Sequence, residues 1–326
     1  MRIWLERMWY GQAGGSAWLL PVSWLFLALV QLRRQAYRRG WLASGHPGRP
    51  VVVIGNLTVG GSGKTPLTVW LACALAARGL RVGIASRGYG GRVIRPAPVS
   101  ADSDPVEVGD EPVLLARRSG ARVVVGRDRL AAARLLAPDV DVILADDGLQ
   151  HYPLQRDLEI LVIDGERRFG NGRLLPAGPL REPVSRAAHV DAIVVNGGAA
   201  AAGEIAMQVE AGEVVSLDGG CRLPLAAYAG RQVHAVAGIG HPARFYATLR
   251  AAGVVPIEHA LADHAALTAA DLAFGDTLPV LMTEKDAVKC RHFPPARLAF
   301  LEVSAQLAPA EAERLLDRIA ALAIRP

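Results

Sequence analysis

One glycine-rich segment constrains the fold of this chain more than any other feature. Residues 55–66 read Gly-Asn-Leu-Thr-Val-Gly-Gly-Ser-Gly-Lys-Thr-Pro, between the apolar run Val51–Ile54 and the helix-like stretch Pro66–Arg78. A strand that passes through such a turn into a helix is a building unit of parallel sheets. The glycines let backbone N–H groups turn toward one point, where the positive end of the helix dipole also lies. We therefore expect an α/β fold with an anion site at this turn.

The same segment predicts which residues would surround a nucleotide. Lys64 stands where an ammonium group reaches the β- and γ-phosphates, and Thr65 stands where a hydroxyl binds Mg²⁺. Thr58 replaces the first glycine of the usual pattern, G-x-x-x-x-G-K-[ST]. The chain has only three lysines against 33 arginines, so a lysine here is not expected by chance. The expected ATP-binding residues are Thr58, Val59, Gly60, Gly61, Ser62, Gly63, Lys64 and Thr65.

Two acidic residues follow another apolar run. Asp146 and Asp147 come directly after Val142–Ala145. Proteins with a phosphate loop hold magnesium with an acid at the end of a neighbouring strand. We expect Asp146 and Asp147 to bind Mg²⁺ together with Thr65; the alternative is that the pair caps the following turn.

Apolar β-branched runs alternate with helix-like stretches from residue 50 onward, the pattern of a parallel sheet covered on both faces. Residues 46–212 are expected to form a P-loop NTPase-type core, with strands at Val51–Ile54, Val82–Ala85, Val123–Val125, Val142–Ala145, Ile160–Ile163 and Ile193–Val195.

A second unit is expected after a break in this pattern. Residues 213–230 are rich in glycine and polar side chains and are expected to be a linker. Residues 231–326 are expected to form a smaller α/β domain. Its expected strands are Val233–Ala237, Val254–His259 and Val280–Thr283, and its expected helices are Pro242–Ala252 and Thr268–Phe274.

The N-terminal third differs from the rest in charge and in aromatic content. Residues 1–101 hold 13 Lys or Arg and one acid, Glu6, whereas the remainder carries a net charge of −7. Five of the six tryptophans lie within residues 1–41, and tryptophan favours the boundary between lipid headgroups and acyl chains. Between them lies the predominantly apolar stretch Ala17–Leu32, which four arginines follow within seven residues.

A helix over Ala17–Leu32 would be about 24 Å long, whereas the hydrocarbon core of a bilayer is about 30 Å thick. We therefore expect residues 1–45 to form a helical segment that associates with the membrane interface. The alternatives are a helix buried in the protein and a cleaved signal peptide. The signal peptide is disfavoured because no clear cleavage site follows and because the phosphate loop requires cytosolic nucleotide.

Composition excludes several classes of protein. An apolar content of 51% in 326 residues is enough for a buried core and excludes a disordered chain. Cys73, Cys221 and Cys290 are odd in number, far apart and in no metal-ligand spacing. They predict neither a disulfide framework nor a zinc site, and a reducing cytosolic setting fits them best.

Seven further segments resemble one enzyme family. They are Ser86-Arg-Gly-Tyr-Gly-Gly91, Val108-Gly-Asp-Glu-Pro112, Asp146-Asp-Gly-Leu-Gln-His151, Leu175-Pro-Ala-Gly-Pro-Leu-Arg-Glu-Pro183, Ala237-Gly-Ile-Gly240, Asp263-His264 and Thr283-Glu-Lys-Asp-Ala-Val-Lys289. In this order, from about residue 10 to residue 290, the chain resembles the tetraacyldisaccharide 4'-kinases of Gram-negative lipid A synthesis. The resemblance implies an enzyme on the cytoplasmic face of the inner membrane. It would use MgATP to phosphorylate the 4'-hydroxyl of a tetraacylated glucosamine disaccharide 1-phosphate, giving a lipid A precursor.

The resemblance also implies catalytic roles. Asp110 matches the family's proposed base, which would accept the proton of the sugar hydroxyl, and His264 matches its hydrogen-bonding partner. Arg181 would join the phosphate-loop lysine in stabilising charge on the transferring phosphoryl group. The alternatives are that Asp110 caps a helix starting at Pro112, that His264 is a surface residue, and that Arg181 pairs with Glu182.

Other residues of the matched segments are expected to contact the substrate or to support residues that do. His151 has the alternative of merely lining the cleft, and Thr283–Asp286 is expected to form a structural or nucleotide-proximal turn. The turn holds one of the two other lysines, Lys285, and the second, Lys289, follows it. The residues expected near the substrate are Arg87, Glu111, Gln150, His151 and Glu182.

Two other classes of function compete with the kinase. A membrane-associated P-loop ATPase or GTPase acting as a switch or assembly factor would hydrolyse nucleotide without a small-molecule acceptor. A nucleic-acid-binding ATPase would use the basic N-terminus, but the long apolar stretch and the lack of a nucleic-acid module disfavour it. For the kinase we expect a lipid substrate and a membrane surface as partners, with no nucleic acid and no obligate protein partner.

Overall fold

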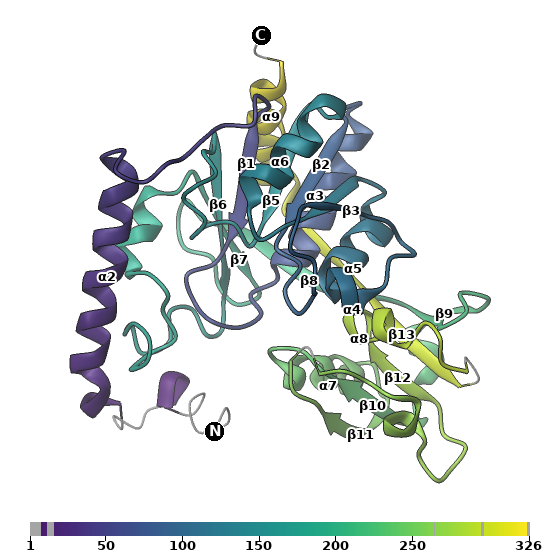
Figure 1. Ribbon diagram of the computed structural model, residues 1–326. Helices are drawn as coiled ribbons and strands as arrows, with labels where there is room; N and C mark the ends of the chain where they lie inside the picture. The colour runs from purple at the N-terminus through teal and green to yellow at the C-terminus, as the bar shows by residue number, and fades with distance from the viewer. Residues whose placement is uncertain (1–7, 12–15, 264, 295–296, 325–326) are drawn as a thin grey trace.

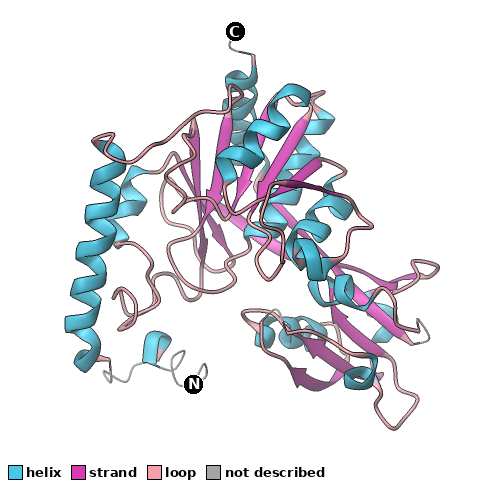
Figure 2. Cartoon of the chain, viewed as in Figure 1, coloured by secondary structure: helices cyan, strands magenta, loops and turns pink. Residues whose placement is uncertain are grey.

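The computed structural model describes residues 8–11, 16–263, 265–294 and 297–324. Within these ranges a single sheet of 13 strands carries helices on both faces (Figure 1, Figure 2). The strands are β1 Val51–Gly55, β2 Val82–Ser86, β3 Ala97–Val99, β4 Arg122–Val125, β5 Val142–Asp146, β6 Leu158–Asp164, β7 Ala192–Asn196, β8 Ile205–Ser216, β9 Arg222–Pro224, β10 Gln232–Ala237, β11 Val255–Ala260, β12 Val280–Thr283 and β13 Leu298–Leu307. Their order is β11-β10-β12-β13-β8-β7-β6-β1-β5-β2-β4-β3, with β9 paired to β8.

The helices of the described residues are short, apart from α2, α3 and α9. The α-helices are α2 Leu20–Arg38, α3 Lys64–Ala77, α4 Pro105–Val108, α5 Asp110–Ser119, α6 Arg129–Leu136, α7 Pro242–Ala251, α8 Glu284–Ala287 and α9 Pro309–Ala323. The 3-10 helices are η1 Ala17–Leu19, η2 Ala137–Asp139, η3 Val184–His189, η4 Leu225–Tyr228, η5 Ala269–Leu272 and η6 Val288–Cys290.

The sheet consists of two parallel halves that run in opposite directions. In the larger half β4, β2, β5, β1, β6, β7 and β8 are parallel. In the smaller half β11, β10, β12 and β13 are parallel. The two halves are joined by the antiparallel pair β8 and β13. The carboxyl-terminal ends of the strands in one half therefore face those in the other.

The β8–β13 pair sets the separation of these two edges. Asn196 at the end of β7 is level with Met207, and Thr283 at the end of β12 is level with Leu301. Between these levels the two strands form a ribbon that runs along β13 from Leu301 to Leu307. At about 3.3 Å per residue the ribbon holds the edges roughly 20 Å apart. Ligands of open α/β sheets bind at carboxyl-terminal edges, and here two such edges border one space.

Each half of the sheet is packed on both faces. In the larger half α3, α5 and α9 cover one face, with Leu71, Leu115 and Ile319 in one apolar cluster. On the opposite face α6 contributes Leu136 to a second cluster. In the smaller half α7 covers one face with Leu249. The two facing edges of the sheet are thus each supported by a packed apolar core.

The predicted α/β fold with a mainly parallel sheet is confirmed, and the expected strands end within two residues of the observed ones. The smaller unit, however, continues the same sheet. Residues 213–230 are structured, and the expectation of a linker is wrong. They contain the end of β8, strand β9 and η4, because the glycines at 219 and 220 form a turn of a hairpin.

Two further expectations need correction. Residues 231–326 do not all belong to the smaller half, because α9 packs its apolar face on α3 in the core of the larger half. The helix expected at Thr268–Phe274 is only the 3-10 turn Ala269–Leu272. A capping box of Thr268 and Asp271 starts this turn, and the chain leaves the helical conformation at Ala273, whose ψ is 69°.

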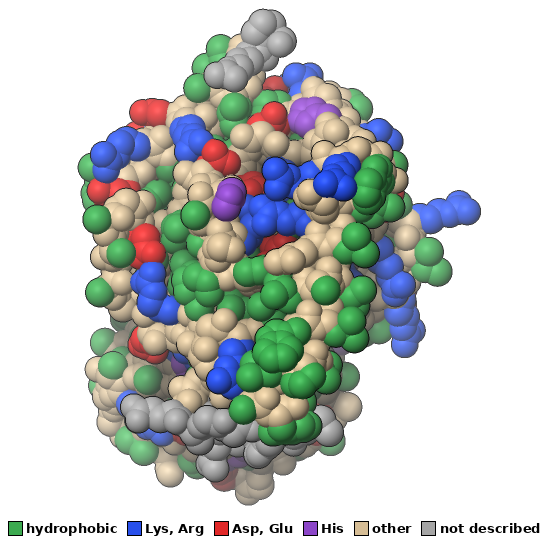
Figure 3. All heavy atoms as spheres, turned by 90° about the vertical axis from the view of Figure 1, so that its left-hand side faces the viewer, with side chains coloured by type: hydrophobic (Ala, Val, Ile, Leu, Met, Phe, Trp, Pro, Cys, Tyr) green, Lys and Arg blue, Asp and Glu red, His purple; other side chains and the backbone are tan. Residues whose placement is uncertain are grey.

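The N-terminal helix lies along one side of the molecule (Figure 1). Helix α2, preceded by η1, covers the expected helical stretch and extends it to Arg38. Much of its apolar surface is exposed, including Trp24 at 64% and Leu25 at 62%. Figure 3 looks onto this side and shows hydrophobic side chains together with Lys and Arg. None of the helices in the described part of the chain is long and apolar enough to cross a membrane.

Candidate active site

A cleft of about 790 Å³ lies between the two facing edges of the sheet. The ribbon of β8 and β13 contributes Gln208, Val209 and Val303 to its lining. The larger half contributes the phosphate loop, the smaller half contributes the loop after β10, and the N-terminal segment contributes two aromatic side chains. These lining residues include Val59, Gly60, Gly61, Ser62, Gly63, Lys64, Thr65, Ile239, Gly240, Trp9 and Tyr10.

The segment predicted to be a phosphate loop, residues 55–66, forms the expected turn between strand β1 and helix α3. Gly60 and Gly63 have φ values of 111° and 96°, which favour glycine, and α3 begins at Lys64. A Cβ on Gly63 would lie 2.4 Å from the amide nitrogen of Asn196. The buried hydroxyl of Ser62 has no hydrogen-bond partner among the described residues. Such a donor at a helix N-terminus suits a phosphate oxygen.

The expected acid pair lies beside the loop lysine. Lys64 Nζ is 3.4 Å from Asp147 Oδ1, and Arg181 Nη1 is also 3.4 Å from Asp147 Oδ1. Burial disfavours the charge of Asp147, but Lys64, Arg181 and Arg129 lower its pKa to about 2. Asp146 is 2% exposed, and burial together with the charges of nearby carboxylates raises its pKa to about 7. One carboxylate is thus held ionised, and the other is crowded by negative charge.

These oxygen donors fit a magnesium ion. The carboxylates of Glu111 and Asp147 both raise the pKa of Asp146, and a divalent cation would remove this repulsion. The described residues include no group of three or more His, Cys, Asp or Glu side chains that could hold a metal alone. Magnesium is usually held by one or two carboxylates together with substrate phosphates. When bound, the ion would neutralise charge on the phosphates.

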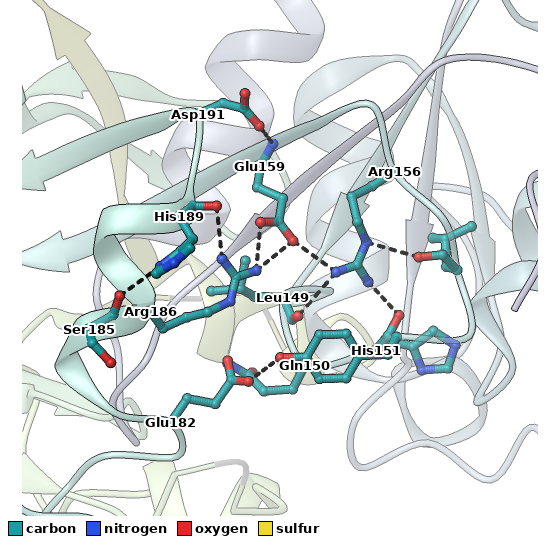
Figure 4. A network of polar contacts seen from close by, with 12 residues as sticks. Leu149, Gln150, His151, Arg156, Glu159, Glu182, Ser185, Arg186, His189 and Asp191 are labelled. Carbon is teal, nitrogen blue, oxygen red and sulfur yellow. Dashed lines mark hydrogen bonds and ion pairs between the residues drawn. The ribbon is translucent and has the colours of Figure 1, made fainter. Parts of the chain in front are cut away.

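A polar network holds the Asp146–His151 and Leu175–Pro183 segments together (Figure 4). Arg186 donates to both oxygens of Glu159 at 2.6 Å, and Arg156 donates to the same carboxylate at 2.9 Å. Arg156 also donates to the His151 carbonyl at 2.6 Å. Glu159 on β6 therefore ties the segment that carries the acid pair to the η3 helix that follows Arg181.

Glu182 and Gln150 take part in the same scaffold. Glu182 is 1% exposed and accepts hydrogen bonds from Gln150 and from the Tyr152 hydroxyl. Gln150 also donates to the Asn56 carbonyl at 3.0 Å, at the start of the phosphate loop. The alternative pairing of Arg181 with Glu182 is therefore wrong, because Arg181 faces Asp147 instead. Glu182 supports the site without lining the cleft.

Asp110 and Glu111 begin α5, so the alternative of a helix that starts at Pro112 is wrong. Asp110 is 5% exposed and accepts from the Glu111 amide, and Lys289 Nζ lies 3.7 Å from its Oδ2. Lys285 Nζ donates to Glu111 at 3.0 Å and to Asp263 at 3.3 Å. Despite burial, Glu111, Asp110 and Asp263 raise the pKa of Lys285. His264 lies outside the described residues.

Asp286 of the Thr283–Lys289 segment is structural. It is fully buried and accepts from the Gly238 amide at 2.7 Å and from the Thr283 hydroxyl at 2.6 Å. These bonds fix the loop after β10, and a Cβ on Gly240 in that loop would lie 2.8 Å from the Gly61 amide nitrogen. The smaller half therefore touches the phosphate loop directly.

Seven of the described sequence-predicted residues do not line the cleft: the four already placed beside it, Asp110, Asp146, Gln150 and Glu182, and three more, Arg87, His151 and Thr58. Arg87 is exposed on the loop after β2. The His151 side chain does not contact the cleft. Burial and the charge of Arg129 lower its pKa to about 4. Its Nε2 is buried without a hydrogen-bond partner among the described residues. Thr58 is held in a bridge with Leu180 that aligns the phosphate loop with the Leu175–Pro183 segment.

Sequence reasoning missed several residues of the site. Asn196 at the end of β7 is 3% exposed and donates to the Ser62 carbonyl at 3.1 Å. Arg244 on α7 lines the cleft and reaches Asp164 at 4.0 Å across from the smaller half. Thr68 Oγ1 lies 3.3 Å from Asp146 Oδ1. Asn196 could have been noticed as a polar residue at the end of an apolar strand. Arg244 could not, because it is one of 33 arginines and belongs to no motif.

The sequence is similar to known proteins along almost its whole length. The sequence model of the family described as tetraacyldisaccharide-1-P 4'-kinase matches residues 15–321. The tetraacyldisaccharide 4'-kinase of Methylobacillus flagellatus is 50% identical over 323 residues, which cover 98% of this chain and 96% of the relative. That of Alkalilimnicola ehrlichii is 53% identical over 306 residues, which cover 93% of this chain and 92% of the relative.

The fold is also similar to a solved structure, the crystal structure of LpxK from Aquifex aeolicus in complex with ATP. The TM-score is 0.77 at 30% sequence identity, and the match covers 93% of this chain and 98% of that chain. The resemblance inferred from the motifs is thereby confirmed. The chain belongs to the tetraacyldisaccharide 4'-kinase family and is, like its relatives, a kinase.

Proposed function

We propose that this protein transfers the γ-phosphate of ATP to the 4'-hydroxyl of a tetraacyldisaccharide 1-phosphate, giving a lipid A precursor. One observation carries the proposal. The phosphate loop, Asp147, Arg181 and Glu111 line a cleft that the N-terminal segment also lines, and Asp110 precedes Glu111 at the start of α5. The solved structure from Aquifex aeolicus is a complex with ATP. In this chain, the positive φ values of Gly60 and Gly63 in the phosphate loop support ATP binding.

The residues of the larger half would hold the nucleotide. Backbone amides of Gly60 to Gly63 and the Ser62 hydroxyl would bind phosphate oxygens, and Lys64 would neutralise charge on the β- and γ-phosphates. Thr65, Asp146 and Asp147 would hold Mg²⁺, whose charge assists transfer. Arg181, which faces Asp147, would move its guanidinium charge toward the transferring phosphoryl group.

The acceptor hydroxyl needs a base to take its proton, and Asp110 is the residue best suited to this role. It is a buried carboxylate at the first turn of α5, beside the lysine pair of the smaller half. In this proposal Asp110 takes the proton of the 4'-hydroxyl as the oxygen attacks phosphorus, and the bond to the ADP oxygen breaks. Glu111 and Lys285 would orient the reacting groups.

The N-terminal segment would bring the acylated substrate to the cleft. Ser23 on α2 donates to the Leu174 carbonyl at 2.8 Å and accepts from the Ala177 amide at 3.1 Å. Trp9 Nε1 donates to the Pro176 carbonyl at 3.0 Å. The helix with exposed apolar side chains is thus attached to the segment that carries Arg181. We propose that α2 lies in the cytoplasmic face of the inner membrane, with its arginines at anionic headgroups.

The reaction itself tests the proposal and separates it from a nucleotide switch. Purified full-length chain is mixed with γ-labelled ATP and tetraacyldisaccharide 1-phosphate in detergent micelles, and the lipid products are separated. A labelled bisphosphorylated lipid and ADP release that rises at least tenfold with the lipid are expected. ADP release that ignores the lipid, with no labelled product, would favour the switch.

A further inference from the structure

Two of the chain's three lysines, Lys64 and Lys285, line the cleft, and the third, Lys289, lies beside Asp110. Lys64 belongs to the phosphate loop, and the other two, Lys285 and Lys289, lie four residues apart on the α8–η6 segment of the smaller half. Both reach the first residues of α5 in the larger half. Lys285 contacts Glu111 at 3.0 Å, and Lys289 approaches Asp110 at 3.7 Å. The two halves of the site therefore meet through two ammonium groups.

Lys289 is enclosed by two carboxylates that are almost entirely buried. Its side chain is 11% exposed, and its ammonium group lies 2.9 Å from Asp286 Oδ1, on a side chain that is 0% exposed. Asp110, on the other side, is 5% exposed. Buried charges of this kind persist only when they are paired. Lys289 is thus the cation shared between a structural carboxylate and the carboxylate assigned as the base.

The Asp286 carboxylate is itself fixed in place. Its Oδ2 accepts from the Gly238 amide and from the Thr283 hydroxyl, so its position is set by the loop after β10 and the end of β12. The same loop touches the phosphate loop where Gly240 approaches Gly61. A continuous chain of contacts therefore runs from the phosphate loop through Asp286 and Lys289 to Asp110.

We propose that Lys289, held by Asp286, is a positioning residue that orients the Asp110 carboxylate for the acceptor hydroxyl. The inference rests on the proposed function, in which Asp110 is the base. Lys289 acts through Asp110 because its ammonium group is already bonded to Asp286 and, like the Asp110 carboxylate, is nearly buried, whereas the next residue, Glu111, lines the cleft. Neighbouring charges on Asp110 also include Lys285. Without Lys289 the carboxylate keeps the bond from the Glu111 amide to its Oδ1 but loses the ammonium group that faces its Oδ2.

The primary test is Lys289→Gln, whose amide still donates to Asp286 while the charge beside Asp110 is lost. We expect kcat to fall at least about tenfold and the KM for ATP to stay within about threefold, because nucleotide binding is left intact. Lys289→Arg restores the charge and is expected to recover most of the lost kcat. Arg291→Gln, which removes an exposed charge two residues further along, is the control and should retain wild-type kinetics.

A double-mutant cycle separates positioning from a general structural effect. In an Asp110→Asn background, whose kcat is already low, Lys289→Gln should lower kcat less than about twofold further. An undiminished tenfold loss in that background, or wild-type kcat for Lys289→Gln alone, would overturn the inference. Should Lys289→Gln lack a cooperative unfolding transition, the same cycle with Lys289→Met, which also removes the charge, decides, since an undiminished loss of kcat in the Asp110→Asn background counts against the inference. Failure of the proposed function is distinct, because wild-type protein would then label no lipid.

Discussion

At the scale of single residues, Arg181 and its neighbour Glu182 contact different parts of the molecule. Its guanidinium faces Asp147 at 3.4 Å, while Glu182 turns into the buried scaffold. We expect Arg181→Gln to lower kcat by about 10²- to 10³-fold, because a charge aimed at the transferring group is lost. Arg168→Gln, which removes the surface pair with Glu204, should leave kcat unchanged. Label transfer in micelles measures both, and equal rates for Arg181→Gln and wild type would contradict the assignment.

His151 makes a pH-dependent contribution to stability. Burial, with Arg129, lowers its pKa from 6.5 to about 4, so between these values the unfolded chain binds a proton that the folded chain does not. Stability from this source is present above pH 6.5 and is lost as the pH falls toward 4. We expect the drop in Tm from pH 7 to pH 5 to be about 3 °C smaller in His151→Gln than in wild type. Parallel Tm profiles would show that His151 does not contribute.

The sequence identified some of these residues and not others, for physical reasons. Lys64, Asp147 and Arg181 come together because a loop, a strand end and a motif segment share one edge of the sheet. Asp286 looked like a possible nucleotide contact, but its full burial and its bond to Gly238 depend on the packing of β10 against β12. Contacts of this kind are set by tertiary structure and leave no local pattern.

At the scale of elements, helix α2 is attached to the site while its apolar side stays exposed. Leu25 and Leu29 are 62% and 57% exposed. We expect the double variant Leu25→Glu/Leu29→Glu to bind phosphatidylethanolamine–phosphatidylglycerol vesicles at least about tenfold more weakly, because two apolar contacts are replaced by charges that anionic headgroups repel. Leu135→Glu, which changes a 50% exposed leucine on α6, is the control. Vesicle sedimentation measures the binding, and equal binding by all three proteins would refute an interfacial α2.

The loop after β10 and the phosphate loop approach too closely for an added side chain. A Cβ at Gly240 would lie 2.8 Å from the Gly61 amide nitrogen, so one of the two backbones must shift. We expect Gly240→Ala to raise the KM for ATP about tenfold, because the phosphate-binding amides move. Gly275→Ala, where a Cβ meets no heavy atom within 4 Å, should have no effect on KM. An unchanged KM for ATP in both variants would contradict the prediction, because the loop after β10 would then accommodate the added methyl group without moving the phosphate-binding amides.

The elements that the sequence did not predict are the ones that join the two halves. Strand β8 reads Ile-Ala-Met-Gln-Val-Glu-Ala-Gly-Glu-Val-Val-Ser, and most of its residues are exposed or half-buried. Its central residues line the cleft or face solvent, so they lack the continuous apolar run of β1. Strand β13 and helix α9 follow the last matched motif and had no functional signal. Residues 213–230, which include only the end of β8, were expected to be a linker, and the ribbon that sets the spacing of the site was not predicted.

At the scale of the whole molecule, the facing carboxyl-terminal edges explain why residues far apart in sequence meet. The larger half supplies the phosphate loop and the acid pair, and the smaller half supplies the lysines that contact Asp110 and Glu111. The ribbon holds these edges roughly 20 Å apart. A rotation about β8 and β13 would change that separation, and domain closure of this kind commonly completes a kinase site.

The central claim is that this cleft transfers phosphate from ATP held at Lys64 to a lipid acceptor. The most direct measurement is label transfer from γ-labelled ATP to tetraacyldisaccharide 1-phosphate by wild type and by Lys64→Ala. Arg78→Ala, at the opposite end of helix α3, is the control for loss of a positive charge. Wild type and Arg78→Ala should form labelled bisphosphorylated lipid at similar rates, and Lys64→Ala should be slower by at least about 10²-fold. A Lys64→Ala protein that labels the lipid at the wild-type rate would contradict the account.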